Sequence, residues 1–136
     1  MQTEHLQNVR LGVVGLAWLI AVALASLLMI ALLGLNLIEP DSAIGTRVAL
    51  GAVALGFFAG GLFAGLRSGS APMLHGVLIG LLSLVVWFVL NLITAVLFKD
   101  FGWQALTPNL AIALVLVQIV AAILGARSGY RRTRPR

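Results

Sequence analysis

The sequence predicts an all-α, polytopic membrane protein with four transmembrane helices, and three observations support this fold class. Hydrophobic residues make up 61% of the 136 positions, and the mean hydropathy is +1.10, far above the range of soluble globular domains. Four long stretches carry no charge: 11–38, 48–66, 68–98 and 101–126. A helix rises about 1.5 Å per residue, so roughly 20 apolar residues cross the ~30 Å hydrocarbon core. Each stretch therefore predicts one spanning helix.

The first two helices are predicted at 11–37 and 43–66. The first ends before Pro40, because proline lacks the backbone N–H that a helix interior requires. Ser42 is the predicted N-cap of the second helix, since a serine hydroxyl accepts a hydrogen bond from an unpaired N–H of the first turn.

The third and fourth helices are predicted at 72–98 and 107–127. Ser70 is the expected cap of the third helix, and Thr107 the expected cap of the fourth. A short basic tail, 128–136, follows. The whole chain, 1–136, is therefore expected to form a single four-helix transmembrane domain.

Basic residues are distributed unevenly along the chain. With four spans both termini lie on one side, and that side carries seven of the nine Lys and Arg residues. The positive-inside rule therefore predicts that both termini are cytoplasmic. Five arginines on this side are expected to contact anionic lipid or a partner protein: Arg67, Arg127, Arg131, Arg132 and Arg134. Nucleic-acid binding is not expected, because the tail has one tyrosine and no folded context.

Small residues recur at helical spacing on several spans. Helices in a bilayer associate through close backbone approach, which small side chains permit. The residues predicted to pack helices together are Ala52, Gly56, Gly60, Ala64, Gly61, Gly65, Gly76, Gly80, Ala121 and Gly125. They favour close packing within the chain, with a homodimer interface or a ligand groove as the alternatives.

The ends of the second and fourth helices resemble each other. Gly65-Leu66-Arg67-Ser68-Gly69 is followed sixty residues later by Gly125-Ala126-Arg127-Ser128-Gly129. Glycine and arginine are common where helices leave a membrane, so coincidence is one explanation. The other is a pair of repeated helical hairpins, with halves 1–66 and 67–136 in the same orientation.

The third helix carries a polar face. At 100° per residue, its small and polar residues fall within a sector of about 80°, and these residues are Gly76, Gly80, Ser83, Trp87, Asn91 and Thr94. An unpaired amide in hydrocarbon costs several kcal/mol, so this face should look into the bundle. Gln118 is the expected partner on the fourth helix. The face favours interhelical hydrogen bonding, with a polar cleft for a lipid headgroup or small solute as the alternative.

Several kinds of chemistry are disfavoured by the sequence. The mid-span regions hold no acidic or basic residue, which disfavours proton- or ion-coupled transport. Cysteine is absent, which excludes disulfides and thiolate metal sites. No catalytic constellation is present, so neither enzymatic activity nor a metal or cofactor is expected. His75, in the first turn of the third helix, is the one candidate ligand for a haem or chlorophyll.

Two glycine-rich runs resemble a pattern in a known family. Gly60-Gly61-Leu62-Phe63-Ala64-Gly65 and His75-Gly76-Val77-Leu78-Ile79-Gly80 are similar to the YrzE-like family of small four-helix bacterial membrane proteins. The similarity covers about residues 55–90. The resemblance implies a protein of the bacterial cytoplasmic membrane with four helices, and it implies no particular chemistry.

The sequence as a whole favours a non-enzymatic scaffold or accessory subunit in the membrane. Packing surfaces are abundant, while ionisable mid-span residues and extramembrane domains are missing. The expected partners are membrane lipids together with another membrane protein or a second copy of the chain. The alternative is a small uncoupled channel or carrier, or a lipid-binding protein, that uses the polar face of the third helix.

Overall fold

The computed structural model describes residues 9–39, 42–97 and 108–133, and it confirms the all-α, four-helix fold. The helices are α1 (Leu11–Gly34), α2 (Ala43–Ser68), α3 (Pro72–Leu97) and α4 (Pro108–Thr133). Each is long and apolar enough to cross a membrane, and the described residues contain no strand. The chain is therefore a multi-pass membrane protein.

Helix α1 ends three residues earlier than the predicted boundary at 37. Asn36 has φ 52°, its N–H donates to the Leu33 carbonyl, and the Leu37 N–H donates to the Leu32 carbonyl. This pair of hydrogen bonds around a left-handed residue is a Schellman motif, which satisfies the last carbonyls of a helix. The prediction relied on Pro40 and missed that an asparagine terminates the helix first.

Helix α2 begins as predicted. The Ser42 hydroxyl accepts a hydrogen bond of 2.8 Å from the Gly45 N–H, as an N-cap does. At the other end, Gly69 has φ +64°, a left-handed conformation that glycine adopts without steric cost. The chain then turns directly into α3. The expected cap of α4, Thr107, lies outside the described residues.

Helix α4 runs six residues further than the predicted boundary at 127, so most of the expected tail is helical. Gly129 lies against α2, where a Cβ atom would approach the Leu66 nitrogen to 2.9 Å, so packing holds this last part of the helix. Arg131 and Arg132 are exposed in the last turn, where positive charge interacts favourably with the helix dipole. The prediction placed the boundary at the first arginine and did not allow for a helix that continues beyond the hydrocarbon.

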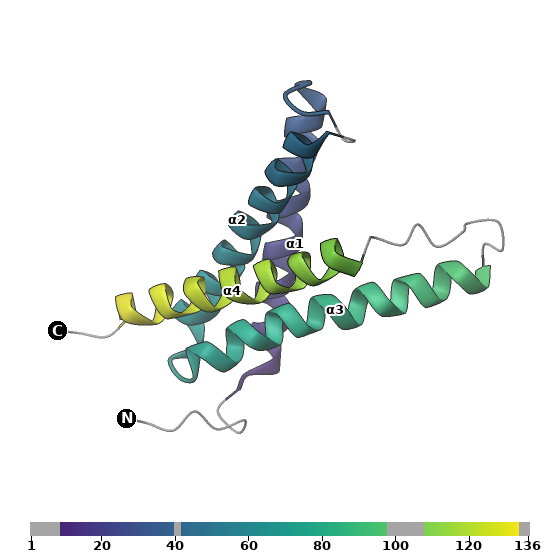
Figure 1. Cartoon of the computed structure of the whole chain (residues 1–136). Helices are drawn as coiled ribbons and strands as arrows, with labels where there is room; N and C mark the ends of the chain where they lie inside the picture. Colours follow the sequence, from purple (N-terminus) through teal and green to yellow (C-terminus); the bar gives the residue numbers. More distant parts are fainter. Residues whose placement is uncertain (1–8, 40–41, 98–107, 134–136) are drawn as a thin grey trace.

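The four helices form two antiparallel hairpins, α1–α2 and α3–α4, that cross each other (Figure 1). They meet near the end of the molecule where α2 leads into α3, and they diverge toward their other ends. Helix α2 is the central helix, because it packs against both α1 and α4 and has the largest buried share of the four spans.

Two rows of small residues on α2 face two different neighbours. The first row, Ala52, Gly56, Gly60 and Ala64, is buried. Within it, a Cβ at Gly56 would meet Ala25, with 2.8 Å between the Cβ atoms, and a Cβ at Gly60 would meet Ala21 at the same distance. The α1 surface is itself made of buried alanines. Antiparallel α1 and α2 therefore approach closely enough for their backbones to touch.

The second row on α2, Gly61 and Gly65, faces α4. A Cβ at Gly61 would lie 2.8 Å from Cα of Ala122, and a Cβ at Gly65 would lie 2.8 Å from the carbonyl carbon of Ala126. Residue numbers rise together along both helices, so α2 and α4 run parallel. We call this contact the α2–α4 seam.

The α2–α4 seam has an internal two-fold symmetry. A Cβ at Gly61 points at the Ala122 carbonyl oxygen, and one at Gly125 points at the Phe58 carbonyl oxygen. The same exchange relates the contact of Gly65 with Ala126 to the contact of Gly129 with Leu62. Equivalent positions are therefore 64 residues apart, as Gly61 and Gly125 are, and not the sixty of the matching helix ends.

Candidate functional site

A pocket of about 370 Å³ lies between α3 and α4, where these two helices separate. Closer to the α2–α3 turn they are in tight contact: a Cβ at Gly76 would lie 2.6 Å from Cα of Ile123, and a Cβ at Gly80 would lie 3.1 Å from Cα of Ile119. Three residues after Gly80 the lining of the pocket begins. The glycines at 76 and 80 thus let α3 and α4 approach closely, and the larger residues beyond them keep the two helices apart.

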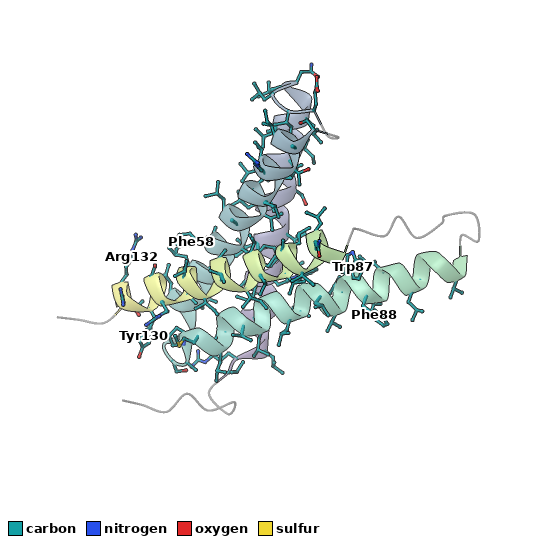
Figure 2. The ribbon with its side chains drawn as sticks, viewed as in Figure 1. Phe58, Trp87, Phe88, Tyr130 and Arg132 are labelled. Atoms are coloured by element: carbon teal, nitrogen blue, oxygen red, sulfur yellow. The ribbon has the colours of Figure 1, made fainter. Side chains whose placement is uncertain are left out.

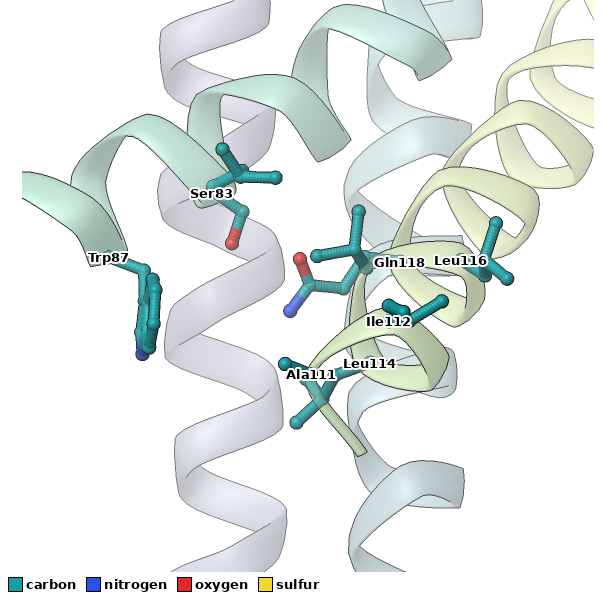
Figure 3. A pocket seen from close by; sticks show the side chains of 9 residues that line it. Ser83, Trp87, Ala111, Ile112, Leu114, Leu116 and Gln118 are labelled. Carbon is teal, nitrogen blue, oxygen red and sulfur yellow. The ribbon is translucent and has the colours of Figure 1, made fainter. Parts of the chain in front are cut away.

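The pocket is mainly apolar and contains two polar side chains. Its lining residues are Ser83, Leu84, Trp87, Ala111, Ile112, Leu114, Val115, Leu116 and Gln118. The Ser83 hydroxyl and the Gln118 carboxamide point toward each other across the pocket, and Trp87 flanks them on the α3 side (Figure 3). Both polar side chains are half-buried, and neither makes a hydrogen bond with another described residue.

Part of the polar face predicted on the third helix is thus found at the pocket or in contact with α4. Ser83, Trp87 and Gln118 line one pocket, while Gly76 and Gly80 lie on the same side of α3 and contact α4. The side chains of Asn91 and Thr94, the other two polar residues of the predicted face, lie outside the described part of the structure. The expected hydrogen bond between the third and fourth helices does not form between Ser83 and Gln118.

The position of Gln118 explains why it faces a pocket. It lies four residues before Ala122 and seven before Gly125, so it continues the stripe of α4 that forms the α2–α4 seam. The hairpins diverge in this direction (Figure 1), and no α2 residue is among those that line the pocket. Gln118 therefore has no α2 neighbour and faces the pocket.

Both ring nitrogens of His75 contact backbone atoms of the chain. Its side chain is fully buried, and its Nδ1 lies 2.9 Å from the Ala71 carbonyl oxygen. The backbone N–H of Arg10 donates to Nε2, with 3.2 Å between the two nitrogens. These contacts correspond to the neutral tautomer that donates from Nδ1 and accepts at Nε2. The ring links Arg10, the residue before α1, to the start of α3, where Ala71 has the left-handed φ of 44°. Both ring nitrogens are engaged, so neither is free to bind a haem or chlorophyll in this arrangement.

The arginines expected to contact lipid lie at one end of the molecule. Arg67 is in the last turn of α2, and Arg127, Arg131 and Arg132 are near the end of α4, all four exposed. Figure 2 shows Arg132 and Tyr130 at this end, far from Trp87 and Phe88 on the outer part of α3, which we define as residues 84–96. Arg134 lies outside the described residues. The described residues contain no group of three or more His, Asp or Glu that could hold a metal ion.

Two sets of packing residues were not predicted from the sequence. Ala17, Ala21 and Ala25 form the surface of α1 that receives α2. On α4 the α2–α4 seam uses Ala122 and Ala126 in addition to the predicted Gly125, whereas Ala121 is buried beside them. The four-residue spacing of the α1 alanines was a usable signal, although alanine is less distinctive than glycine because it is also common on lipid-facing surfaces.

Comparison with protein-family models, with curated proteins and with solved structures gives no match to this chain.

Proposed function

We propose that the protein is a non-enzymatic scaffold or accessory subunit of the bacterial cytoplasmic membrane, which packs against a second copy of itself or against another membrane protein. The observation that supports this proposal most strongly is the exposure of the outer part of α3. From residue 84 to residue 96 every described side chain except Val86 is exposed: Leu84, Val85, Trp87, Phe88, Val89, Leu90, Leu92, Ile93 and Val96.

Over residues 87–90 the exposure extends around the whole circumference of the helix. Consecutive residues such as Trp87, Phe88, Val89 and Leu90 point in four directions about the axis, and all four are exposed. Helices in a multi-span protein usually pack on at least one side through van der Waals contacts with neighbours. The glycine rows are already used inside the chain, between α1 and α2 and along the α2–α4 seam. The face of the outer part of α3 that carries Val85, Phe88 and Leu92, none of which lines the pocket, is therefore the surface we assign to a partner.

The proposed orientation places both termini in the cytoplasm. In that orientation Arg67, Arg127, Arg131 and Arg132 lie at the cytoplasmic surface, where anionic lipids attract basic residues by roughly 1 kcal/mol each. The resemblance to the YrzE-like family agrees with a bacterial membrane. A nucleic-acid partner is not proposed.

Photo-crosslinking in native membranes tests the proposal. A photoreactive phenylalanine analogue at Phe88, which is 55% exposed, should yield one protein adduct of defined mass. The same analogue at Leu19, which is 56% exposed on α1, is the matched control and should yield mainly lipid adducts. Two differently tagged copies of the chain distinguish a second copy from another protein. Lipid adducts alone at Phe88 would show that α3 has no protein partner.

A further inference from the structure

We propose that the pocket between α3 and α4 binds a neutral, lipid-soluble small molecule that carries a ketone or hydroxyl group and places it at the middle of the bilayer. The proposal depends on residues of one hairpin only, so it does not require the partner protein proposed above. It assigns a ligand class to a site that contains two unpaired polar groups in apolar surroundings.

The depth of the pocket restricts the ligand. Gln118 lies nine residues after Asn109 and nine before Arg127, the polar residues that bracket its span. At about 1.5 Å per residue, its Cα is roughly 14 Å along the helix axis from the Cα of each of these two residues. Ser83 lies eleven residues into α3, at a similar depth. A phospholipid headgroup belongs at the surface of the bilayer, so the group that meets these side chains must itself be stable within the hydrocarbon.

The chemistry of the pocket defines the recognised group. None of its lining residues carries a charge, which disfavours an ionic ligand in a medium of low dielectric constant. A hydroxyl and a carboxamide can both donate and accept hydrogen bonds. The Ser83 and Gln118 groups face each other across the pocket (Figure 3), so a single carbonyl or hydroxyl placed between them can bond to both. The remaining walls suit an apolar or aromatic body, and Trp87 offers a ring for stacking.

The shape of the lining favours a small molecule over a transmembrane helix of a partner. Close approach of helices in a bilayer requires small residues at the contact. Most of this lining is bulky, with Leu84, Trp87, Ile112 and Leu116 among its residues. A helix backbone could not approach Ser83 and Gln118 past these side chains. A pocket of about 370 Å³ is within the usual range for small-molecule sites.

Benzophenone is a suitable probe, because it is a neutral aromatic ketone that reacts with nearby C–H bonds on irradiation. The full-length protein in lipid nanodiscs would be irradiated with benzophenone, and the adducts located by peptide mass spectrometry. We expect adducts concentrated on pocket residues such as Leu84 and Leu116. Diphenylmethanol should compete, whereas diphenylmethane, which has the same skeleton without the polar group, should compete about two- to tenfold less well, because that is the factor that one hydrogen bond contributes.

Variants separate the contributions of polarity and space. Gln118→Leu should reduce benzophenone labelling about two- to tenfold while the protein keeps its thermal stability. Ala111→Phe should block labelling by filling the pocket, and Ala113→Phe, on the same helix but not in the lining, is its matched control. Ser83→Ala is paired in the same way with Ser26→Ala, an exposed serine on α1.

Three results would overturn the proposal. Wild-type labelling spread evenly over exposed residues of all four helices would show that the pocket has no preference for the probe, and this result does not depend on any variant. Equal competition by diphenylmethanol and diphenylmethane would show that Ser83 and Gln118 do not recognise a polar group. Pocket labelling in nanodiscs that is blocked in native membranes by a crosslinkable protein would assign the pocket to a partner instead.

Discussion

A single methyl group added at Gly125 tests the α2–α4 seam. A Cβ at this position would meet the Phe58 carbonyl oxygen and would lie 2.8 Å from the Leu62 nitrogen. Both are backbone atoms of a helix, so neither can rotate away. Ordinary van der Waals contact begins at 3.4 Å, and the nitrogen alone therefore requires the helices to separate by about 0.6 Å, the difference between 3.4 and 2.8 Å.

The matched control is Gly51→Ala, because a Cβ at Gly51 would have no atom within 4 Å. Both substitutions gain the helix propensity of alanine over glycine, about 1 kcal/mol, so this term cancels in the comparison. Overpacking of a tight contact costs about 1–3 kcal/mol. We therefore expect Gly125→Ala to have a free energy of unfolding lower than that of Gly51→Ala by about 1–3 kcal/mol.

Reversible unfolding in mixed dodecylmaltoside and SDS micelles, followed by far-ultraviolet circular dichroism, measures this difference. The two variants should show the same helix content before unfolding, since neither glycine terminates a helix. Equal unfolding midpoints would mean that α2 and α4 do not approach each other at Gly125. The tight seam and its two-fold symmetry would then both be wrong.

Three further predictions concern the ends of the helices. His75→Leu removes the acceptor for the backbone N–H of Arg10 and the donor to the Ala71 carbonyl. The free energy of unfolding in the same micelles should therefore fall by about 1–3 kcal/mol. Unchanged stability would show that the ring does not link α1 to α3. Ser42→Ala removes the cap of α2 and should cost about 1 kcal/mol, whereas Ser42→Gly should cost only a few tenths; equal losses would argue against capping by the hydroxyl. In a chain without native cysteine, a cysteine at Ser42 should react with an impermeant maleimide in intact cells, and one at Thr133 only after permeabilisation; the reverse pattern would invert the topology.

The fold was predictable because charge and helix-ending residues divide the chain at a scale that matches the bilayer. The uncharged stretches gave the number of helices, and Ser42 gave the start of the second one. The errors lie at two ends where the change in charge does not coincide with the end of the helix. An asparagine ended α1 inside an uncharged stretch, and α4 continued past Arg127 because Gly129 still had a neighbour to pack against. Helix ends are thus set partly by tertiary contacts that a single sequence does not display.

The small-residue rows identified contact surfaces but not the partners of each surface. Gly60 and Gly61 are 100° apart on α2, so two neighbours were implied, yet nothing local assigns one to α1 and the other to α4. The pocket was harder still to predict. Its polar residues were visible as a pattern, and the pattern suggested that they would bond to each other. They instead face a pocket, because α3 and α4 separate beyond Gly80, and that separation depends on how the two helices pack.

The symmetry of the α2–α4 seam makes a prediction about energetic coupling. Gly61 and Gly125 are equivalent positions on opposite sides of this one contact, and a methyl group at either pushes the same two helices apart. Once Gly61→Ala has separated them, Gly125→Ala meets a wider gap. The double variant should therefore lose less stability than the sum of the single losses, with a coupling of about 0.5–3 kcal/mol as is typical of residues in contact.

Gly56 provides the control for this coupling, because it lies on the other face of α2, where an added Cβ would meet Ala25 of α1 at 2.8 Å. Gly56→Ala should separate α1 from α2 and leave the α2–α4 seam in place. Its loss of stability should add to that of Gly125→Ala within about 0.5 kcal/mol, as for independent sites. Additive losses for Gly61 with Gly125, together with coupled losses for Gly56 with Gly125, would mean that the two rows on α2 have been assigned to the wrong neighbours.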